Sequence, residues 1–157
     1  MATPRDELAA RFGDRYDARY GQAMLERSMG AVPGVPAYLG MKITDVGPGF
    51  AVCEIELRPE LMNPVGVAHG AVVASLVDHV LGAAVISHLE PGTWPATLEF
   101  KLNYLAPARE GTLSAWSEVR SISKRTAVVE VECTNAGRTV AVALGTIAIT
   151  PPKPPPT

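Results

Sequence analysis

The sequence predicts an α+β fold in which a curved antiparallel sheet wraps one long helix. Residues 71–87 form a long apolar stretch, which is typical of a helix buried in a core. Segments of alternating apolar and polar residues precede and follow it, and the later segments are joined by connections of only a few residues. Such connections are too short for parallel crossovers, so we expect antiparallel neighbours. At 157 residues the chain fits one domain with a sizeable core.

Residues 1–36 are expected to form a helical arm and a loop. Thr3 offers a hydroxyl that can cap a helix, and Pro4 suits the first helical position. Two prolines and a glycine within residues 31–36 predict a loop that separates the arm from the main domain, which should span residues 37–150. The arm is expected to cap the core.

A hairpin is predicted between the arm and the long helix. Residues 47–49 have the sequence Gly-Pro-Gly, which supplies a turn. In residues 50–58 apolar side chains alternate with charged ones, which is the pattern of a half-buried strand, and residues 41–46 supply its partner.

Four strands are predicted after the helix. In the first, residues 97–105, one face should carry Leu98, Phe100, Leu102 and Tyr104 and the other Thr97, Glu99, Lys101 and Asn103. The remaining strands should cover residues 113–122, 126–134 and 139–150. Residues 151–157 are rich in proline and cannot join a sheet, so an extended, solvated tail is expected.

Charge and composition argue against several classes of protein. The 14 Lys and Arg residues and 16 Asp and Glu residues leave a formal charge of −2 without a basic run, so no nucleic-acid partner is expected. The opening residues lack an apolar signal core, which favours a cytoplasmic location. No membrane span is expected either, because Asp78 and His79 lie at the midpoint of the long apolar stretch.

Several reactive side chains lie outside any motif and are expected to be structural. Cys53 and Cys133 are the only cysteines, and each lies in a strand pattern where a buried, unpaired thiol behaves as a small hydrophobe. His79 adjoins Asp78 on the helix but points about 100° away from it, which favours a packing or interface role. His88, near the helix end, is expected to favour the negative end of the helix dipole.

The start and the middle of the long helix carry the candidate chemistry. Gly70 opens the helix, where unpaired N–H groups can hold an oxyanion or a polarised carbonyl, and His69 can donate a hydrogen bond or brace the loop. A glycine at a helix start is ordinary capping in most proteins. Asp78 is more informative, because a carboxylate in an apolar helix is costly to desolvate unless a partner or a function compensates it.

Asp78 cannot serve the Gly70 of its own chain. It lies eight residues further along the helix, which is about 12 Å at about 1.5 Å per residue. A shared site therefore requires that Asp78 of one chain meets Gly70 and Asn63 of another, across a dimer interface. The alternative is that Asp78 is a core acid bonded to neighbouring backbone or to the Ser75 hydroxyl one turn earlier.

These residues resemble a family motif. The matching run is Asn63, His69-Gly70-Ala71 and Leu76-Val77-Asp78, followed by residues 97–108 with their tyrosine and the closing Pro-Ala pair. The arrangement resembles the hotdog-fold thioesterases, in particular the phenylacetate-pathway (PaaI-like) type, over about residues 41–150. The fold implied by the resemblance is a long central helix wrapped by a curved antiparallel sheet.

The resemblance also implies an activity and roles. In this family the N–H of the helix-start glycine polarises the thioester carbonyl, and the helical carboxylate of the other subunit acts as general base or nucleophile. Gly70 and Asp78 match these positions, while Asn63 and His69 match residues that position the reacting group, and Thr97 matches a hydroxyl that helps to position water. The implied reaction is hydrolysis of an acyl-CoA thioester by a homodimer or a dimer of dimers. It needs no metal and no cofactor beyond the coenzyme A of the substrate.

Two features qualify the match. Many relatives have a second glycine where this chain has Ala71, whose methyl group is expected to narrow the approach of a bulky acyl group. Thr97 lies on the predicted polar row of its strand, so it can contribute only if an interface covers that face. Candidate cations for the phosphates of coenzyme A are Arg109, Lys124 and Arg125, all in turns between strands.

Two other functions remain possible from the sequence. A hydratase or dehydratase on the same fold would use His69 as its base, although the usual His-Phe-Pro-Gly loop of the dehydratases is missing. A non-catalytic module would bind acyl-CoA, or simply dimerise, without turnover.

Overall fold

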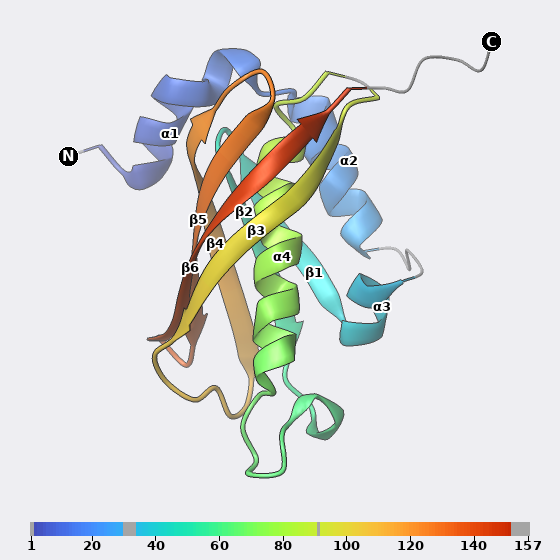
Figure 1. Cartoon of the computed structure of the whole chain (residues 1–157), viewed down its shortest axis with the longest axis vertical. Helices are drawn as coiled ribbons and strands as arrows, with labels where there is room; N and C mark the ends of the chain where they lie inside the picture. The colour runs from blue at the N-terminus through green and yellow to red at the C-terminus, as the bar shows by residue number, and fades with distance from the viewer. Residues whose placement is uncertain (1, 30–33, 91, 152–157) are drawn as a thin grey trace.

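The computed structural model describes residues 2–29, 34–90 and 92–151. A six-stranded antiparallel sheet in the order β1-β2-β4-β5-β6-β3 curves around helix α4, as Figure 1 shows. The helices are α1 (Pro4–Phe12), α2 (Ala18–Met29), α3 (Val35–Leu39) and α4 (Gly70–Ile86), with short 3-10 turns at Gly13–Arg15 and Pro59–Leu61. The strands are β1 (Met41–Gly47), β2 (Phe50–Glu56), β3 (Trp94–Tyr104), β4 (Thr112–Ile122), β5 (Thr126–Asn135) and β6 (Arg138–Thr150). The predicted hotdog fold is confirmed.

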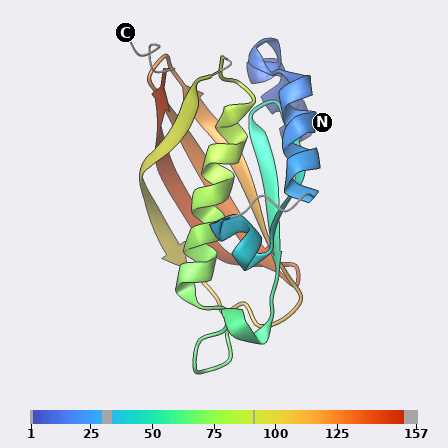
Figure 2. The same cartoon turned by 90° about the vertical axis from the view of Figure 1, so that its right-hand side faces the viewer.

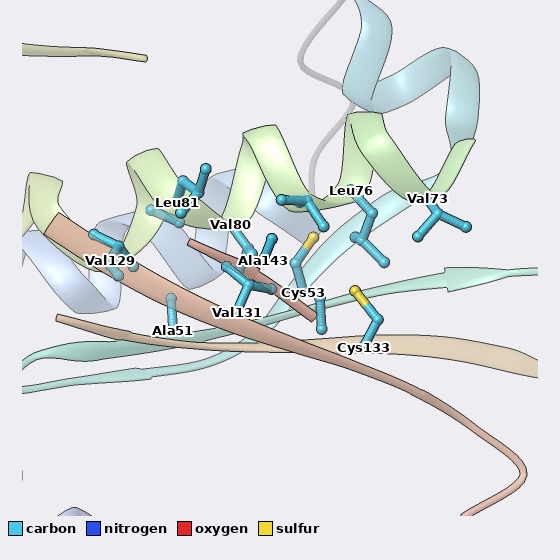
Figure 3. Packing of buried hydrophobic residues seen from close by; sticks show 14 of the residues in the cluster. Ala51, Cys53, Val73, Leu76, Val80, Leu81, Val129, Val131, Cys133 and Ala143 are labelled. Carbon is cyan, nitrogen blue, oxygen red and sulfur yellow. The ribbon is translucent and has the colours of Figure 1, made fainter. Parts of the chain in front are cut away.

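The sheet packs closely on α4 because its concave face carries small side chains. Cys53, Ala115, Cys133 and Ala141 lie in register across four neighbouring strands. Figure 3 shows both cysteines beneath Leu76 and Val80 of the helix. On β6, a Cβ at Gly145 would come within 2.8 Å of the Leu81 Cδ1 atom, so only glycine fits there without a shift.

Both cysteines are buried free thiols, as expected. They lie on β2 and β5 with β4 between them, which separates their Cα atoms by roughly 10 Å and excludes a disulfide in this fold. Burial raises the pKa of both thiols to about 12, so neither is a nucleophile at neutral pH.

A β-bulge in β3 overturns one prediction about that strand. Thr97 pairs with Ile147 but Glu99 pairs with Thr146, so Leu98 is an extra residue in the ladder. The bulge shifts the alternation by one position, which places Thr97 on the helix-facing side together with Phe100 and not in the row of Glu99. Leu98, expected on the apolar face, has 62% of its surface exposed.

The arm packs against one end of the sheet and the helix. Thr3 and Asp6 form the reciprocal capping box at the start of α1, which confirms the predicted helix start. Leu8 and Phe12 are buried in the core. The predicted loop at residues 31–36 lies partly outside the described residues, and its end already begins α3; of the predicted tail, residues 152–157 lie outside them.

His88 does interact with the last turn of α4, but burial, which lowers its pKa, outweighs the hydrogen bonds to the backbone of Val85 and Ala84, which raise it. His88 is buried, and its Nε2 accepts a hydrogen bond of 3.0 Å from the Gly49 N–H, while the rings of Phe12 and Tyr16 contact it. Burial, and then the nearby Arg15 charge, lower its pKa to about 4, so the ring is neutral at neutral pH. It joins the arm and the first hairpin to the end of α4.

The two edges of the sheet differ. Helix α2 packs against the edge strand β1, whereas β3 pairs only with β6 among the described strands (Figures 1 and 2). Large apolar side chains are exposed on β3, where Trp94, Leu98 and Tyr104 have 64%, 62% and 56% of their surface exposed. None of the helices in the described part of the chain is long and apolar enough to cross a membrane.

Candidate active site

Helix α4 begins with an N–H group that has no partner among the described residues. His69 caps the helix, because its Nδ1 accepts a hydrogen bond of 3.0 Å from the Ala71 N–H. The His69 carbonyl accepts from Val72, and the His69 N–H donates to Leu61. Within the described ranges the N–H of Gly70 finds no acceptor, and Gly70 is only half-buried. The helix start therefore keeps one donor available, at the positive end of the helix dipole.

Asn63 shapes the loop that leads to this helix start. Its Oδ1 accepts hydrogen bonds from the N–H groups of Val65 (3.1 Å) and Val67 (3.2 Å). The turn closes at Gly66, whose φ of 76° favours glycine. Because both backbone donors fix the carbonyl end of the amide, the Nδ2 group is left as a donor, and no described residue accepts from it.

Tyr104 also contacts the start of α4, although the sequence motif indicates no role for it. Its hydroxyl donates a hydrogen bond of 2.9 Å to the Gly70 carbonyl. A Cβ at position 70 would lie 3.2 Å from the tyrosine oxygen and 3.3 Å from its Cζ, so Gly70 is also fitted to this ring. The signal available in the sequence was the position of Tyr104 on the same strand face as Phe100 and Leu102.

Asp78 lies on a stripe of α4 that the sheet does not cover. The residues of α4 that are exposed or half-buried are Gly70, Ala71, Ala74, Ser75, Asp78, His79, Gly82 and Ile86. Asp78 itself is exposed and forms no hydrogen bond or ion pair with any residue that the structure describes. The alternative of a core acid bonded to Ser75 is therefore wrong, because the helix face that carries both residues points away from the sheet.

His79 lies beside Asp78 and is half-buried. Burial lowers the pKa of His79 more than the neighbouring Asp78 charge raises it, which favours the neutral ring.

One chain does not bring all the predicted residues together. Asn63, His69 and Gly70 meet at the start of α4, and Asp78 lies about 12 Å further along the helix axis. Thr97 lies seven residues before Tyr104 on β3, which is roughly 23 Å along the strand. The single chain therefore presents a donor cluster and a separate carboxylate on its surface.

The three candidate cations also lie at two ends of the molecule. Arg109 follows Ala108, whose carbonyl accepts from Ala68 just before the helix start. Lys124 and Arg125 form the turn at the other end of β4, a strand of 11 residues and therefore roughly 36 Å long. All three side chains are exposed. Nowhere in the described ranges do three His, Cys, Asp or Glu side chains gather closely enough to hold a metal ion.

Comparison with known proteins identifies the class. The sequence pattern of the thioesterase superfamily matches residues 65–142, which include Gly70 and Asp78. The chain is 30% identical over 102 residues to a 1,4-dihydroxy-2-naphthoyl-CoA hydrolase of Listeria monocytogenes, covering 65% of this chain and 83% of that protein. It is 27% identical over 104 residues to human acyl-coenzyme A thioesterase 13, covering 66% and 74% of the two chains.

The fold is shared with a solved relative. A putative thioesterase from Ralstonia eutropha, described as related to phenylacetic acid degradation, superimposes with a TM-score of 0.74 at 29% identity. The similarity covers 82% of this chain and 98% of that one. The fold, the family match and the named relatives thus define a hotdog-fold enzyme that hydrolyses thioester bonds. The chain belongs to the thioesterase superfamily and is similar to its PaaI-like members.

Proposed function

We propose that the chain hydrolyses acyl-CoA thioesters at two equivalent sites formed between two copies of itself. The observation that carries this proposal concerns a donor and a carboxylate that have no partner in the part of the chain that the structure describes. The Gly70 N–H and Asp78 lie on one helix but too far apart to act together. A two-fold dimer solves this problem, because each donor then meets the carboxylate of the partner subunit.

The surface of α4 supports such a pairing. In two antiparallel helices related by a two-fold axis, residues equally far from the axis face each other. Position 74 lies midway between positions 70 and 78, and it holds the small, half-buried Ala74. With the axis at Ala74, Gly70 faces Asp78 of the partner subunit, and the small residues of the stripe let the two helices approach closely.

The open edge of β3 supports it as well. An unpaired edge strand with exposed apolar side chains is a surface that proteins normally cover. A second copy that packs on the α4 stripe would reach this edge, so one contact would cover both features. We expect two such dimers to associate further into a tetramer.

The chemistry follows from the paired site. The carbonyl oxygen of the thioester accepts a hydrogen bond from the Gly70 N–H, with the Asn63 amide and His69 beside it as further donors. Asp78 of the partner subunit removes a proton from water that attacks the carbonyl carbon, or attacks that carbon itself to give an anhydride that water then cleaves. The carbon–sulfur bond breaks, and the coenzyme A thiolate takes up a proton. Thr97 of the partner subunit, turned to the helix side by the bulge, is proposed to position the water, because Thr97 of the same chain lies far from Gly70.

The coenzyme A phosphates would meet cations from both subunits. Arg109 lies at the same end of the folded subunit as Gly70, whereas Lys124 and Arg125 lie at the opposite end of that subunit. An antiparallel pair brings the opposite end of the partner to the site, so we propose that Arg109 of one subunit and Lys124 and Arg125 of the other neutralise the phosphates.

The test is turnover of a panel of short, long and aromatic acyl-CoAs, measured by release of the free thiol. Asp78→Asn keeps the size of the side chain but removes the base, so we expect kcat to fall by at least about 1,000-fold with unchanged mass in light scattering. Full turnover by Asp78→Asn, or a strictly monomeric active protein, would refute the proposal.

Mixing two inactive variants tests the sharing of sites directly. Gly70→Pro removes the donor N–H, and Asp78→Asn removes the carboxylate. A heterodimer of the two variants contains one site with both defects and one intact site. After random exchange of subunits, about a quarter of the wild-type activity should return. If donor and carboxylate came from the same chain, mixing would restore nothing.

The same assay separates the alternatives. A hydratase would change the double bond of an enoyl-CoA without releasing thiol, and a binding module would bind acyl-CoA without turnover. The Nδ1 atom of His69 already accepts the Ala71 N–H, which leaves it poorly suited to act as the base of a hydratase.

A further inference from the structure

Tyr104 and His69 are joined through a single peptide group. The amide between residues 70 and 71 consists of the Gly70 carbonyl and the Ala71 N–H. The Tyr104 hydroxyl donates to that carbonyl at 2.9 Å, and the N–H of the same amide donates to the His69 Nδ1 at 3.0 Å. A carbonyl that accepts a hydrogen bond makes the N–H of its amide a stronger donor, so the two bonds reinforce each other.

This chain of hydrogen bonds determines the state of the His69 ring. A ring nitrogen that accepts a hydrogen bond carries no proton, so a neutral His69 must hold its proton on Nε2. His69 is exposed, and its Nε2 has no partner among the residues described here. The ring therefore presents Nε2–H as a donor at the helix start, next to the free N–H of Gly70.

We infer that Tyr104 is a positioning residue of the thioesterase site: through the Gly70–Ala71 amide it holds His69 in the Nε2–H tautomer and in a fixed orientation. His69 can then donate to the thioester carbonyl together with the Gly70 N–H. This inference rests on the proposed function for the step at the carbonyl, but the link between Tyr104 and His69 is independent of it.

The placement of Tyr104 argues against a role in the core of its own chain. More than half of the side chain is exposed, at 56%, so the ring adds little to the core. At Gly70 its hydroxyl binds the carbonyl, and a Cβ at that position would lie only 3.2 Å from the tyrosine oxygen. A tyrosine that only covered the core would need no hydroxyl at this position.

The test compares Tyr104→Phe with Tyr16→Phe in the full-length protein. Tyr104→Phe removes one hydroxyl and keeps the ring against Gly70. Tyr16→Phe is the matched control, because the Tyr16 hydroxyl also donates to a backbone carbonyl, that of Val46, far from the helix start. The tautomer of His69 is read from the nitrogen-15 signals of its ring, assigned by comparison with His69→Gln, and kcat and KM are measured with one acyl-CoA that the wild type hydrolyses.

We expect Tyr104→Phe to lower kcat about five- to tenfold with KM within about twofold, as for the loss of one neutral hydrogen bond. The nitrogen signals should at the same time show a mixture of tautomers, while Tyr16→Phe changes neither. A tautomer change without a loss of kcat overturns the role in catalysis, and a loss of kcat without a tautomer change overturns the route through His69. Because the nitrogen signals need no turnover, failure of the proposed function would be seen separately, as full activity of Asp78→Asn.

Discussion

Gly70 meets two separate requirements at one residue. In the proposed mechanism its N–H must stay free of partners to serve as a donor, and its Cα must leave room for the Tyr104 ring. Only the second requirement concerns the missing side chain. The two can therefore be separated by substitution.

Gly70→Pro and Gly70→Ala form a matched pair for this purpose. Both add a Cβ beside Tyr104, but only proline removes the N–H. Proline is tolerated at the first position of a helix, and His69, with φ −60° and ψ 136°, already has the backbone that precedes a proline. We expect kcat of Gly70→Pro to be about 100- to 1,000-fold below that of Gly70→Ala, with similar melting temperatures. Equal activity of the two variants would show that the N–H takes no part in the reaction.

His88 makes the stability of the fold depend on pH. In the unfolded chain its pKa is about 6.5, and in the folded protein burial lowers the pKa to about 4. Between these values the unfolded state binds more protons, so the stability present above pH 6.5 is lost as the pH falls towards 4. The loss from this one group is roughly 3 kcal/mol. Urea unfolding at pH 7.5 and pH 4.5 should show it in the wild type.

His88→Gln is the control, because a glutamine can still accept from the Gly49 N–H but does not titrate. Its free energy of unfolding should change with pH by roughly 3 kcal/mol less than that of the wild type. Parallel pH profiles for the two proteins would mean that His88 is not the group responsible.

The residues of the site were predictable to different degrees. Asn63, His69, Gly70 and Asp78 carry a linear motif, so their place in the chain was enough to find them. Tyr104 acts through a contact between β3 and the start of α4, residues 34 positions apart, which exists only once the sheet has curved around the helix. The position of His88 near the helix end was predictable, but its burial was not, because that depends on contacts with the arm and with Gly49.

One face of helix α4 packs on the sheet and the other is uncovered. A substitution on the uncovered face tests the proposed dimer. The sheet covers the side with Leu76, Val80 and Leu81, while Ala74 lies on the uncovered stripe. Ala74→Arg would place two like charges opposite each other at the proposed axis, so we expect the dimer to dissociate and activity to fall to the level of Asp78→Asn. Light scattering and thiol release measure both effects.

Ala10→Arg is the matched control for this variant, because Ala10 is exposed on α1, away from the stripe. It should leave mass and activity unchanged. A dimer of Ala74→Arg with wild-type turnover would contradict the proposed pairing of the helices.

The strands show where a sequence pattern stops being informative. The hairpin β1–β2 was predictable, because glycine and proline punctuate a regular alternation of apolar and charged residues. The alternation in β3 was equally regular, yet Thr97 turned out to lie on the opposite face, because the bulge at Leu98 arises from pairing with β6. A bulge adds a residue to the strand without changing the alternation of apolar and polar residues in the sequence. Only the pairing with the neighbouring strand reveals it.

At the scale of the whole molecule, the class of fold followed from one apolar helix and short connections. The order of the strands did not, because the position of β3 beside β6 joins segments that are distant in the sequence. The difference between the two edges of the sheet depends on that order and on the packing of α2 against β1. Together with the motif on α4, these features lead to the hypothesis that two chains form the site.

The unequal edges have a consequence for how far assembly can proceed. A sheet with two bare margins could recruit further copies without limit and grow into a fibre. Here α2 packs against the β1 margin, so among the described strands β3 is the margin left open to strand-to-strand addition. Once two copies have joined there, no bare margin remains to continue the ribbon, and growth in that direction ends by itself.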